Sequence, residues 1–122
     1  MVRVEHRVLV VEDDPSLRDV VVEALSEDGH VVRAAPDGAT ALRIAGDWPP
    51  HLVVLDLMLP GLSGEQFCTA LRELQGLADV LIVVVSAARR ATEVSERLGA
   101  TVMLRKPFDL IELAEQVDEL LR

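Results

Sequence analysis

The sequence alternates between two patterns of apolar residues. Five short runs are almost continuously apolar and rich in valine and leucine: residues 7–11, 30–35, a run that starts at residue 52 and carries Asp56, residues 80–85 and residues 102–104. Such runs are typical of parallel β-strands that are covered on both faces. In the segments between them, apolar residues recur every three or four positions, which predicts amphipathic helices. The pattern therefore predicts five strand–helix units.

Residues that commonly cap helices mark where the predicted helices begin and end. Side chains that can accept hydrogen bonds from the first helical N–H groups precede four of them: Asp14, Asp37, Ser63 and Asp109. Ser63 and Asp109 are also followed three residues later by Gln66 and Glu112, which is the capping-box pattern. Glycines are expected to close four helices: Gly29, Gly46, Gly76 and Gly99.

Strict alternation of strands and helices requires a parallel sheet with right-handed crossovers, and five units are too few to close an eight-stranded barrel. We therefore expect an α/β fold in which helices cover both faces of an open sheet. The 122 residues contain no internal repeat, low-complexity tract or linker, so we expect one domain over residues 1–122. Because 50% of the residues are hydrophobic but only 2% are aromatic, the core must consist mainly of aliphatic side chains.

Charge and hydropathy argue against several classes of protein. The formal net charge of −9 disfavours direct binding to nucleic acid or to anionic membranes, since both require clustered basic residues. No apolar run approaches the roughly 18 residues of a membrane span, so we expect a cytoplasmic protein.

Several side chains are expected to have structural roles only. Cys68 lies in a predicted helix, where a packed thiol is more common than a reactive one. His6, His30 and His51 lie at the starts of strands, and we expect them to be exposed and to have no ligand role. Val20 falls on the apolar face of the first helix and is expected to be buried.

Polar residues collect where the predicted strands end. Glu12 and Asp13 follow the first strand, and Asp56 lies near the end of the third. Ser86 ends the fourth strand and Lys106 follows the fifth. Because the carboxyl ends of parallel strands lie on the same edge of a sheet, these side chains become neighbours. A carboxylate inside a buried strand is costly without a partner, which makes Asp56 the strongest candidate for a working residue.

The chemistry of this group of side chains favours a metal ion and phosphoryl transfer. Three adjacent carboxylates repel one another, and one lysine cannot neutralise them all. Mg²⁺ is the cation that fits best, because it prefers oxygen ligands and retains several waters. Carboxylate, metal, ammonium and hydroxyl groups together are equipped to move a phosphoryl group onto a carboxylate. The sequence lacks a glycine-rich phosphate loop, so we expect a partner protein to supply the phosphoryl group.

Four short motifs in this order resemble the receiver domains of two-component response regulators. They are Val-Leu-Val-Val-Glu12-Asp13, Leu-Asp56-Leu-Met-Leu-Pro-Gly, Ser86-Ala87 after the fourth strand, and Lys106-Pro107-Phe108. The resemblance covers nearly the whole chain. It implies a flavodoxin-like fold, in which a doubly wound parallel sheet of five strands has the order 2-1-3-4-5.

The resemblance also implies a role for each residue of the acidic group. Asp56 would be the phosphoacceptor, Asp13 a direct Mg²⁺ ligand, and Glu12 a ligand that acts mostly through water. Met58 would offer its backbone carbonyl to the metal. A domain of this kind is a switch rather than an enzyme, because it catalyses only its own phosphorylation and dephosphorylation.

The remaining implied roles concern activation and partners. Ser86 would bond a phosphoryl oxygen and move on activation, while Lys106 would pair with Asp56 and later with the phosphoryl group, commonly beside a cis Lys106–Pro107 bond. The donor would be a phosphohistidine on a histidine kinase or a phosphotransfer protein, and the phosphorylated form would bind an unidentified downstream protein. Leu-Met-Leu-Pro-Gly is typical of receivers joined to winged-helix DNA-binding domains. No such domain follows Arg122, so we expect a receiver without an effector domain.

Three departures from the family pattern lie on the output side. Met103 occupies the position where family members usually have an aromatic residue that reports the movement of the hydroxyl residue. The usual Gly-Ala-Asp-Asp is replaced by residues 99–102, Gly-Ala-Thr-Val, and the stretch from Ser86 to Gly99 looks shorter than usual. These departures leave open a receiver-like binding module that has weakened or lost switching. A phosphatase of the haloacid dehalogenase type is disfavoured, because Met58 stands where that family has a second aspartate.

Overall fold

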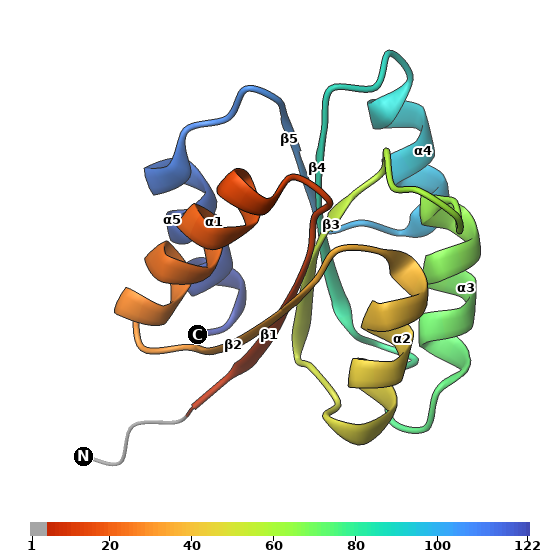
Figure 1. Cartoon of the computed structure of the whole chain (residues 1–122), viewed down its shortest axis with the longest axis horizontal. Coiled ribbons are helices and arrows are strands. Elements are labelled where there is room, and N and C mark those ends of the chain that lie inside the picture. The colour runs from red at the N-terminus through yellow and green to blue at the C-terminus, as the bar shows by residue number, and fades with distance from the viewer. Residues whose placement is uncertain (1–4) are drawn as a thin grey trace.

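The computed structural model describes residues 5–122 and contains one parallel sheet of five strands. The strands are β1 (Arg7–Val11), β2 (Val31–Ala35), β3 (Leu52–Asp56), β4 (Leu81–Ser86) and β5 (Val102–Arg105). Their order in the sheet is β2-β1-β3-β4-β5, and all four neighbouring pairs are parallel. The predicted α/β fold and the strand order implied by the resemblance are therefore confirmed (Figure 1).

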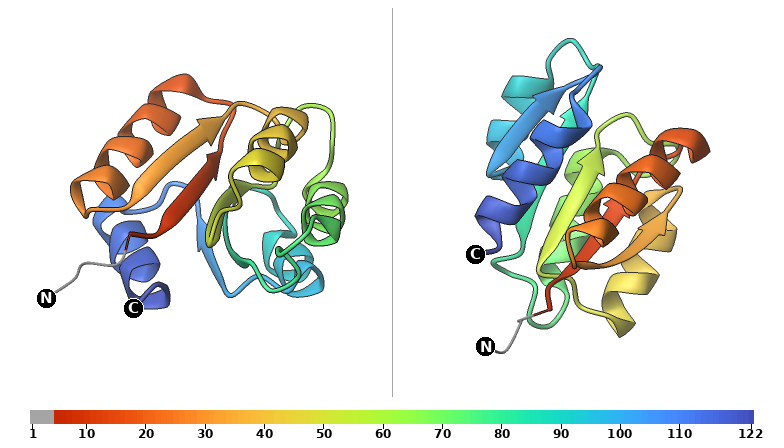
Figure 2. Two further views of the ribbon diagram at one scale, coloured as in Figure 1. Left: turned by 90° about the horizontal axis from the view of Figure 1, so that it is seen from below. Right: turned by 90° about the vertical axis from the view of Figure 1, so that its left-hand side faces the viewer.

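Five helices alternate with the strands and form a layer on each face of the sheet. They are α1 (Pro15–Glu27), α2 (Gly38–Asp47), α3 (Gly64–Glu73), α4 (Ala91–Leu98) and α5 (Leu110–Leu120). Helices α1 and α5 cover one face, and α2, α3 and α4 cover the other (Figures 1 and 2). At eight residues, α4 is the shortest of the five. Within residues 5–122, no helix has the length and hydropathy that crossing a membrane requires.

Each face of the sheet has its own core. Because successive strand side chains point to opposite faces, Val8 and Val10 of β1 pack toward α1 and α5. Leu9 and Val11 of the same strand pack on the other side, with Phe67 of α3. All five side chains are at most 1% exposed. Burying an aliphatic or aromatic side chain contributes about 1.5–3 kcal/mol, so the central strands form a rigid support for the residues at their ends.

The predicted capping residues are confirmed where four of the helices begin. In each case a side-chain oxygen accepts a hydrogen bond from an N–H group of the first turn: Asp14, Asp37, Ser63 and Asp109. Ser63 and Gln66 form both bonds of a capping box, as predicted. In α5, the Asp109 bond to the Ile111 N–H is present, but within residues 5–122 the return bond predicted for Glu112 is not.

The glycines end helices less uniformly than predicted. Gly99 closes α4 in the left-handed conformation, with φ of 69°. Gly29 and Gly76 also have positive φ values, 93° and 81°, and lie just beyond α1 and α3. The prediction for Gly46 is wrong, because Gly46 lies inside α2 and the N–H group of Trp48 closes the helix on the Ile44 carbonyl.

Two expectations about buried side chains have opposite outcomes. Cys68 is 2% exposed, and burial raises the pKa of its thiol to about 11, so it is a packed and protonated residue. The expectation for Val20 is wrong, because its side chain is 44% exposed. Helix α1 buries a narrower stripe, which runs through Val21 and Leu25.

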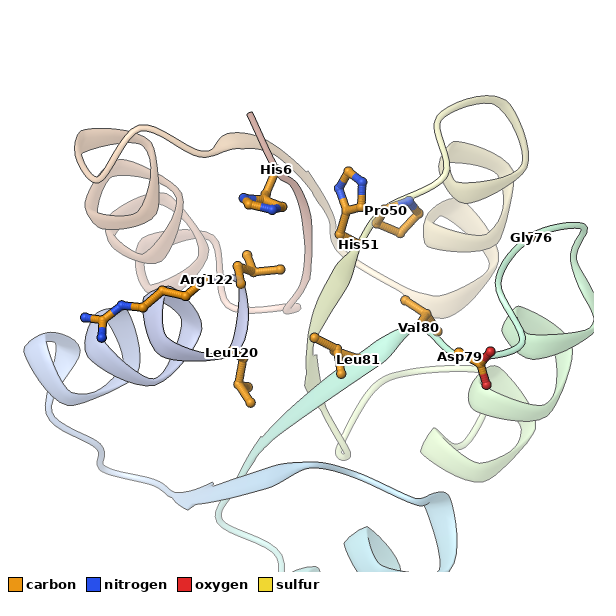
Figure 3. Close-up of a pocket in the computed structure, with 10 residues that line it drawn as sticks. His6, Pro50, His51, Gly76, Asp79, Val80, Leu81, Leu120 and Arg122 are labelled. Atoms are coloured by element: carbon orange, nitrogen blue, oxygen red, sulfur yellow. The ribbon is translucent and has the colours of Figure 1, made fainter. Parts of the chain in front are cut away.

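The three histidines lie at the edge opposite the strand ends, as predicted, but they differ in exposure. His51 is exposed and His6 is half-buried; both line a cavity of about 380 Å³ that also reaches Arg122 (Figure 3). The side chain of His30 is only 10% exposed, because its Nε2 lies 2.6 Å from Oδ1 of Asp118 on α5. The expectation that all three are exposed is therefore wrong for His30.

Candidate functional site

The carboxyl ends of β1, β3, β4 and β5 bring the predicted polar residues to one edge of the sheet (upper edge in Figure 1). Glu12 follows β1 directly, Asp56 is the last residue of β3, Ser86 is the last of β4, and Lys106 follows β5. Glu12, Asp13 and Asp56 each offer a carboxylate oxygen, and these oxygens lie within 4.8 Å of one another. The predicted acidic group is therefore present.

Lys106 is the only lysine in the sequence, and it bonds two of these carboxylates. Its Nζ lies 2.6 Å from Oε1 of Glu12 and 2.9 Å from Oδ2 of Asp56. The Glu12 and Asp56 side chains are only 3% and 5% exposed, against 20% for Lys106. One ammonium group thus bonds two buried carboxylates. Because the pocket has three carboxylates and one ammonium group, it carries an excess of negative charge.

Burial and ion pairing act in opposite directions on the titration of this pocket. Burial raises the pKa of Glu12 above its usual range, and the hydrogen bond from Lys106 only partly opposes this rise. Burial alone would lower the pKa of Lys106, but the hydrogen bonds to Glu12 and Asp56 outweigh it and raise that pKa. The lysine therefore stays charged at neutral pH.

Asp13 differs from the other two carboxylates because it has no side-chain partner among residues 5–122. Both carboxylate oxygens of Glu12 accept hydrogen bonds, one from Lys106 and the other from the Asp14 N–H group, 3.1 Å away. Asp56 accepts at both oxygens as well, from Lys106 and from the Met58 N–H group at 2.9 Å. Asp13 is exposed, and across residues 5–122 its side chain makes no hydrogen bond or ion pair. An exposed, unpaired carboxylate beside two bonded ones suits a hard cation that prefers oxygen ligands.

Ser86 reaches the same edge, but its hydroxyl is directed to its own loop. The residue is fully buried, and its Oγ accepts a hydrogen bond from the Ala88 N–H group at 3.0 Å. Its carbonyl accepts the Lys106 N–H bond of 2.9 Å that continues the β4–β5 ladder. The Lys106–Pro107 bond is cis, as the resemblance implied. Ser86 thus lies opposite Arg105 in the sheet and bonds the backbone of Lys106, while its hydroxyl is held by the loop that leads to α4.

The family model for the response regulator receiver domain matches residues 8–118, which is most of the chain. The chain belongs to this receiver domain family. Receiver domains are signalling switches of two-component systems rather than enzymes, and the acidic pocket with Lys106 is that of a phosphoacceptor switch. The family match also removes the phosphatase alternative.

Curated relatives of the receiver domain are longer proteins. The alkaline phosphatase synthesis transcriptional regulatory protein SphR of Synechococcus elongatus is 42% identical over 127 residues, covering 95% of this chain and 49% of SphR. The response regulator MprA of Mycobacterium tuberculosis is 40% identical over 121 residues, covering 95% of this chain and 50% of MprA. The chain therefore spans about half the length of these relatives.

Solved structures of similar domains agree with the fold. A response regulator from Chloroflexus aurantiacus superposes with a TM-score of 0.88 at 28% identity, over 97% of this chain and 98% of that one. The beryllofluoride-activated DrrB receiver domain superposes with a TM-score of 0.84 at 26% identity, with the same coverage of both chains.

The ion pairs on the output side of the receiver domain are exposed, unlike those of the pocket. Helix α4 begins at Ala91, and its N-cap residue Arg90 makes no side-chain capping bond. The ion pairs Arg90–Glu93 and Arg97–Glu65 along this helix are exposed. Met103, on β5, is half-buried and packs against the core on the α4 face. The flexible thioether of Met103 therefore occupies the position at which the family resemblance predicted an aromatic ring.

Sequence reasoning missed one residue of the receiver domain that contacts the pocket backbone. Nη1 of Arg18, on α1, donates a hydrogen bond of 3.0 Å to the Glu12 carbonyl. The position of Arg18 in the sequence could have indicated this contact. Arg18 lies four residues after the cap residue Asp14, and its side chain can therefore reach the same edge of the sheet.

Proposed function

We propose that Asp56 is the residue of this switch that accepts the phosphoryl group, from a phosphohistidine on a histidine kinase or a phosphotransfer protein. The observation that carries the proposal is the position of Asp56 at the end of a buried strand, with Oδ1 bonded to the Met58 N–H group and Oδ2 to Lys106. These two bonds fix the orientation of the carboxylate, which favours attack by one of its oxygens.

The transfer exchanges one bond to phosphorus for another. A carboxylate oxygen of Asp56 attacks the phosphorus atom, the bond between phosphorus and the donor imidazole nitrogen breaks, and the electron pair of that bond stays on the nitrogen. Lys106 then turns its ammonium group from the Asp56 carboxylate to a phosphoryl oxygen, where it stabilises negative charge. Ser86 supplies a hydroxyl to the same group once its loop releases it.

The residues of the pocket fit Mg²⁺. Asp13 and Asp56 are proposed as direct ligands, Glu12 as a ligand through water, and Met58 as a ligand through its backbone carbonyl. Asp13 supports this assignment because its carboxylate is exposed and, in the described part of the chain, unpaired beside two bonded carboxylates. When bound, the ion would offset the excess negative charge and stabilise the phosphoryl oxygens.

A hollow beside the pocket suits the approach of a protein donor. It has a volume of about 380 Å³, and Lys106 lines it together with the apolar side chains of Leu17, Pro107 and Phe108. An apolar rim next to a charged centre allows a partner to dock while its phosphohistidine reaches Asp56. The proposed setting is the cytoplasm, with a downstream protein as the target of the phosphorylated form and without direct binding to nucleic acid.

A second candidate function is a receiver-like binding module with weakened switching, and Met103 is the observation that favours it. An aromatic ring has two discrete positions, whereas methionine adjusts through several rotamers, so coupling between Ser86 and the output surface would be looser. Hydrogen exchange with and without beryllofluoride distinguishes the two. A cooperative change across residues 87–106 supports the switch, and a change confined to the pocket supports the module.

Phosphorylation by acetyl phosphate tests the assignment of Asp56 directly. With Mg²⁺, intact mass should show addition of one phosphoryl group to the wild type and none to Asp56→Asn. Asp79→Asn is the matched control, because Asp79 is exposed at the opposite edge of the sheet and should leave labelling unchanged. Undiminished labelling of Asp56→Asn would show that another residue is the acceptor.

A further inference from the structure

Arg18 is a half-buried cation close to an acidic pocket, yet it is not part of an ion pair there. Its Nη1 donates to the backbone carbonyl of Glu12 at 3.0 Å. Of the ion pairs that residues 5–122 form, none includes Arg18. The guanidinium group is therefore directed at the backbone of the loop that carries the acidic residues, rather than at a carboxylate.

The hydrogen bond from Arg18 completes the bonding of Glu12. The Glu12 N–H group donates to the carbonyl of Ala35 on β2 at 3.1 Å. The two carboxylate oxygens accept from Lys106 and from the Asp14 N–H group. Its carbonyl is the remaining polar group, and Arg18 satisfies it. Every polar group of Glu12 is thus held by a different part of the molecule.

The hydrogen bond from Arg18 to the Glu12 carbonyl also affects the backbone of Asp13. The Glu12 carbonyl belongs to the peptide unit that joins Glu12 to Asp13, and this unit is a rigid plane. Since the Asp13 side chain makes no bond of its own in residues 5–122, its direction depends on that plane. By holding the carbonyl, Arg18 restrains the peptide plane from which the N–Cα bond of Asp13 leaves.

We propose that Arg18 is a positioning residue for the acidic loop, and that it preorganises Asp13 for a divalent cation. This inference rests on the proposed metal site. The proposed orienting effect of Arg18 on Mg²⁺ affinity is opposite in sign to the effect of its positive charge. A positive charge beside three carboxylates repels a cation, so removing the charge alone would tighten Mg²⁺ binding. Losing the orientation of Asp13 would weaken it.

Mg²⁺ titration of Arg18→Gln and Arg18→Lys, followed by backbone NMR shifts, separates these two effects. Arg18→Gln should bind Mg²⁺ roughly tenfold more weakly than wild type, at the low end of the effect of residues that orient metal ligands. Arg18→Lys keeps a donor and a charge, so it should recover most of the affinity. Arg43→Gln removes the same charge from an exposed position on α2 and should bind as wild type does.

Urea unfolding of the metal-free variants shows whether a change in Mg²⁺ affinity merely reflects a change in stability. Unchanged or tighter Mg²⁺ binding by Arg18→Gln overturns the proposal, and so does a loss of stability in this variant without a loss of affinity. Asp13→Asn separates this failure from failure of the metal site. If wild type binds no Mg²⁺, or if Asp13→Asn binds as well as wild type, the proposed metal site itself is wrong and the inference falls with it.

Discussion

At the carboxyl edge of the sheet, three carboxylates lie close together and two of them bond one ammonium group. At the amino edge, three imidazoles lie side by side at the starts of β2, β1 and β3. The ring centroids of His6 and His30 are 6.3 Å apart, and those of His6 and His51 are 5.4 Å apart. Both edges thus gather titratable side chains from neighbouring strands, but with opposite charge when they ionise.

The two edges differ in how well their side chains are paired within the chain. At the amino edge, His30 bonds Asp118, and Nδ1 of His51 accepts the Arg7 N–H group at 2.9 Å. At the carboxyl edge, Lys106 is shared between two carboxylates and Asp13 has no partner within residues 5–122. An edge with satisfied groups supports the fold, whereas an edge with excess charge is ready to accept a cation or a phosphoryl group.

Lys106→Met should have the largest effect on stability, because it removes the cation that bonds both buried carboxylates, Glu12 and Asp56. Leaving such charges without a partner costs about 3 kcal/mol of unfolding free energy. Urea unfolding without Mg²⁺ measures the loss. The double variant Lys106→Met/Asp56→Asn should recover part of it, and equal stability of the single and double variants would contradict this account.

Asp14→Ala and Asp13→Ala should separate stability from metal binding at adjacent positions. Oδ1 of Asp14 accepts the N–H groups of Ser16 and Leu17, at 3.0 and 3.3 Å, so its loss should cost about 1 kcal/mol and leave Mg²⁺ affinity unchanged. Asp13→Ala should lose Mg²⁺ affinity without destabilising the metal-free protein. Equal loss of affinity in both variants would refute these assignments.

Glu12→Gln should change how stability depends on pH at the carboxyl edge. Burial raises the pKa of Glu12 above 4.5, so the folded state holds this proton more tightly than the unfolded state. The free energy of unfolding should therefore fall as pH rises from 4.5 through the raised pKa, and Glu12→Gln should remove that slope. Urea unfolding across this range without Mg²⁺ tests it. Glu96→Gln, at an exposed position on α4, is the control.

His51→Gln should produce the smallest effect, with the opposite sign, at the amino edge. Although His51 is exposed, partial desolvation of its ring lowers its pKa below 6.5, and the charges of Arg7 and His6 lower it further. The unfolded state therefore binds this proton more tightly, and wild-type stability should fall as pH drops below 6.5. His51→Gln should flatten this part of the profile. If the free energy of unfolding depends on pH in the same way in both proteins, His51 does not make stability depend on pH.

The fold and the pocket could be predicted from the sequence because their signals are local. Apolar runs and caps such as Asp14 and Ser63 define the elements, and the parallel arrangement then brings Glu12, Asp56 and Lys106 together. Neither step needs the conformation of a side chain.

Contacts that depend on side-chain conformation could not be predicted in the same way. The burial of His30 requires Asp118, which lies 88 positions away, and the Arg18 bond requires a long side chain to turn back to the Glu12 carbonyl. The bond from the Ala88 N–H group to the Ser86 hydroxyl is local, but its geometry depends on the loop. Such contacts leave no periodic pattern in a single sequence.

The lone lysine gives the domain a built-in reporter. Because Lys106 is the only lysine in the sequence, a lysine-selective ¹⁵N label places its one side-chain ammonium signal at Glu12 and Asp56. Proteases that cut only after lysine rarely cleave before proline, so they would leave the Lys106–Pro107 bond, and with it the labelled domain, intact. A single resonance could then follow cation binding and phosphoryl transfer in crude mixtures, without any engineered probe.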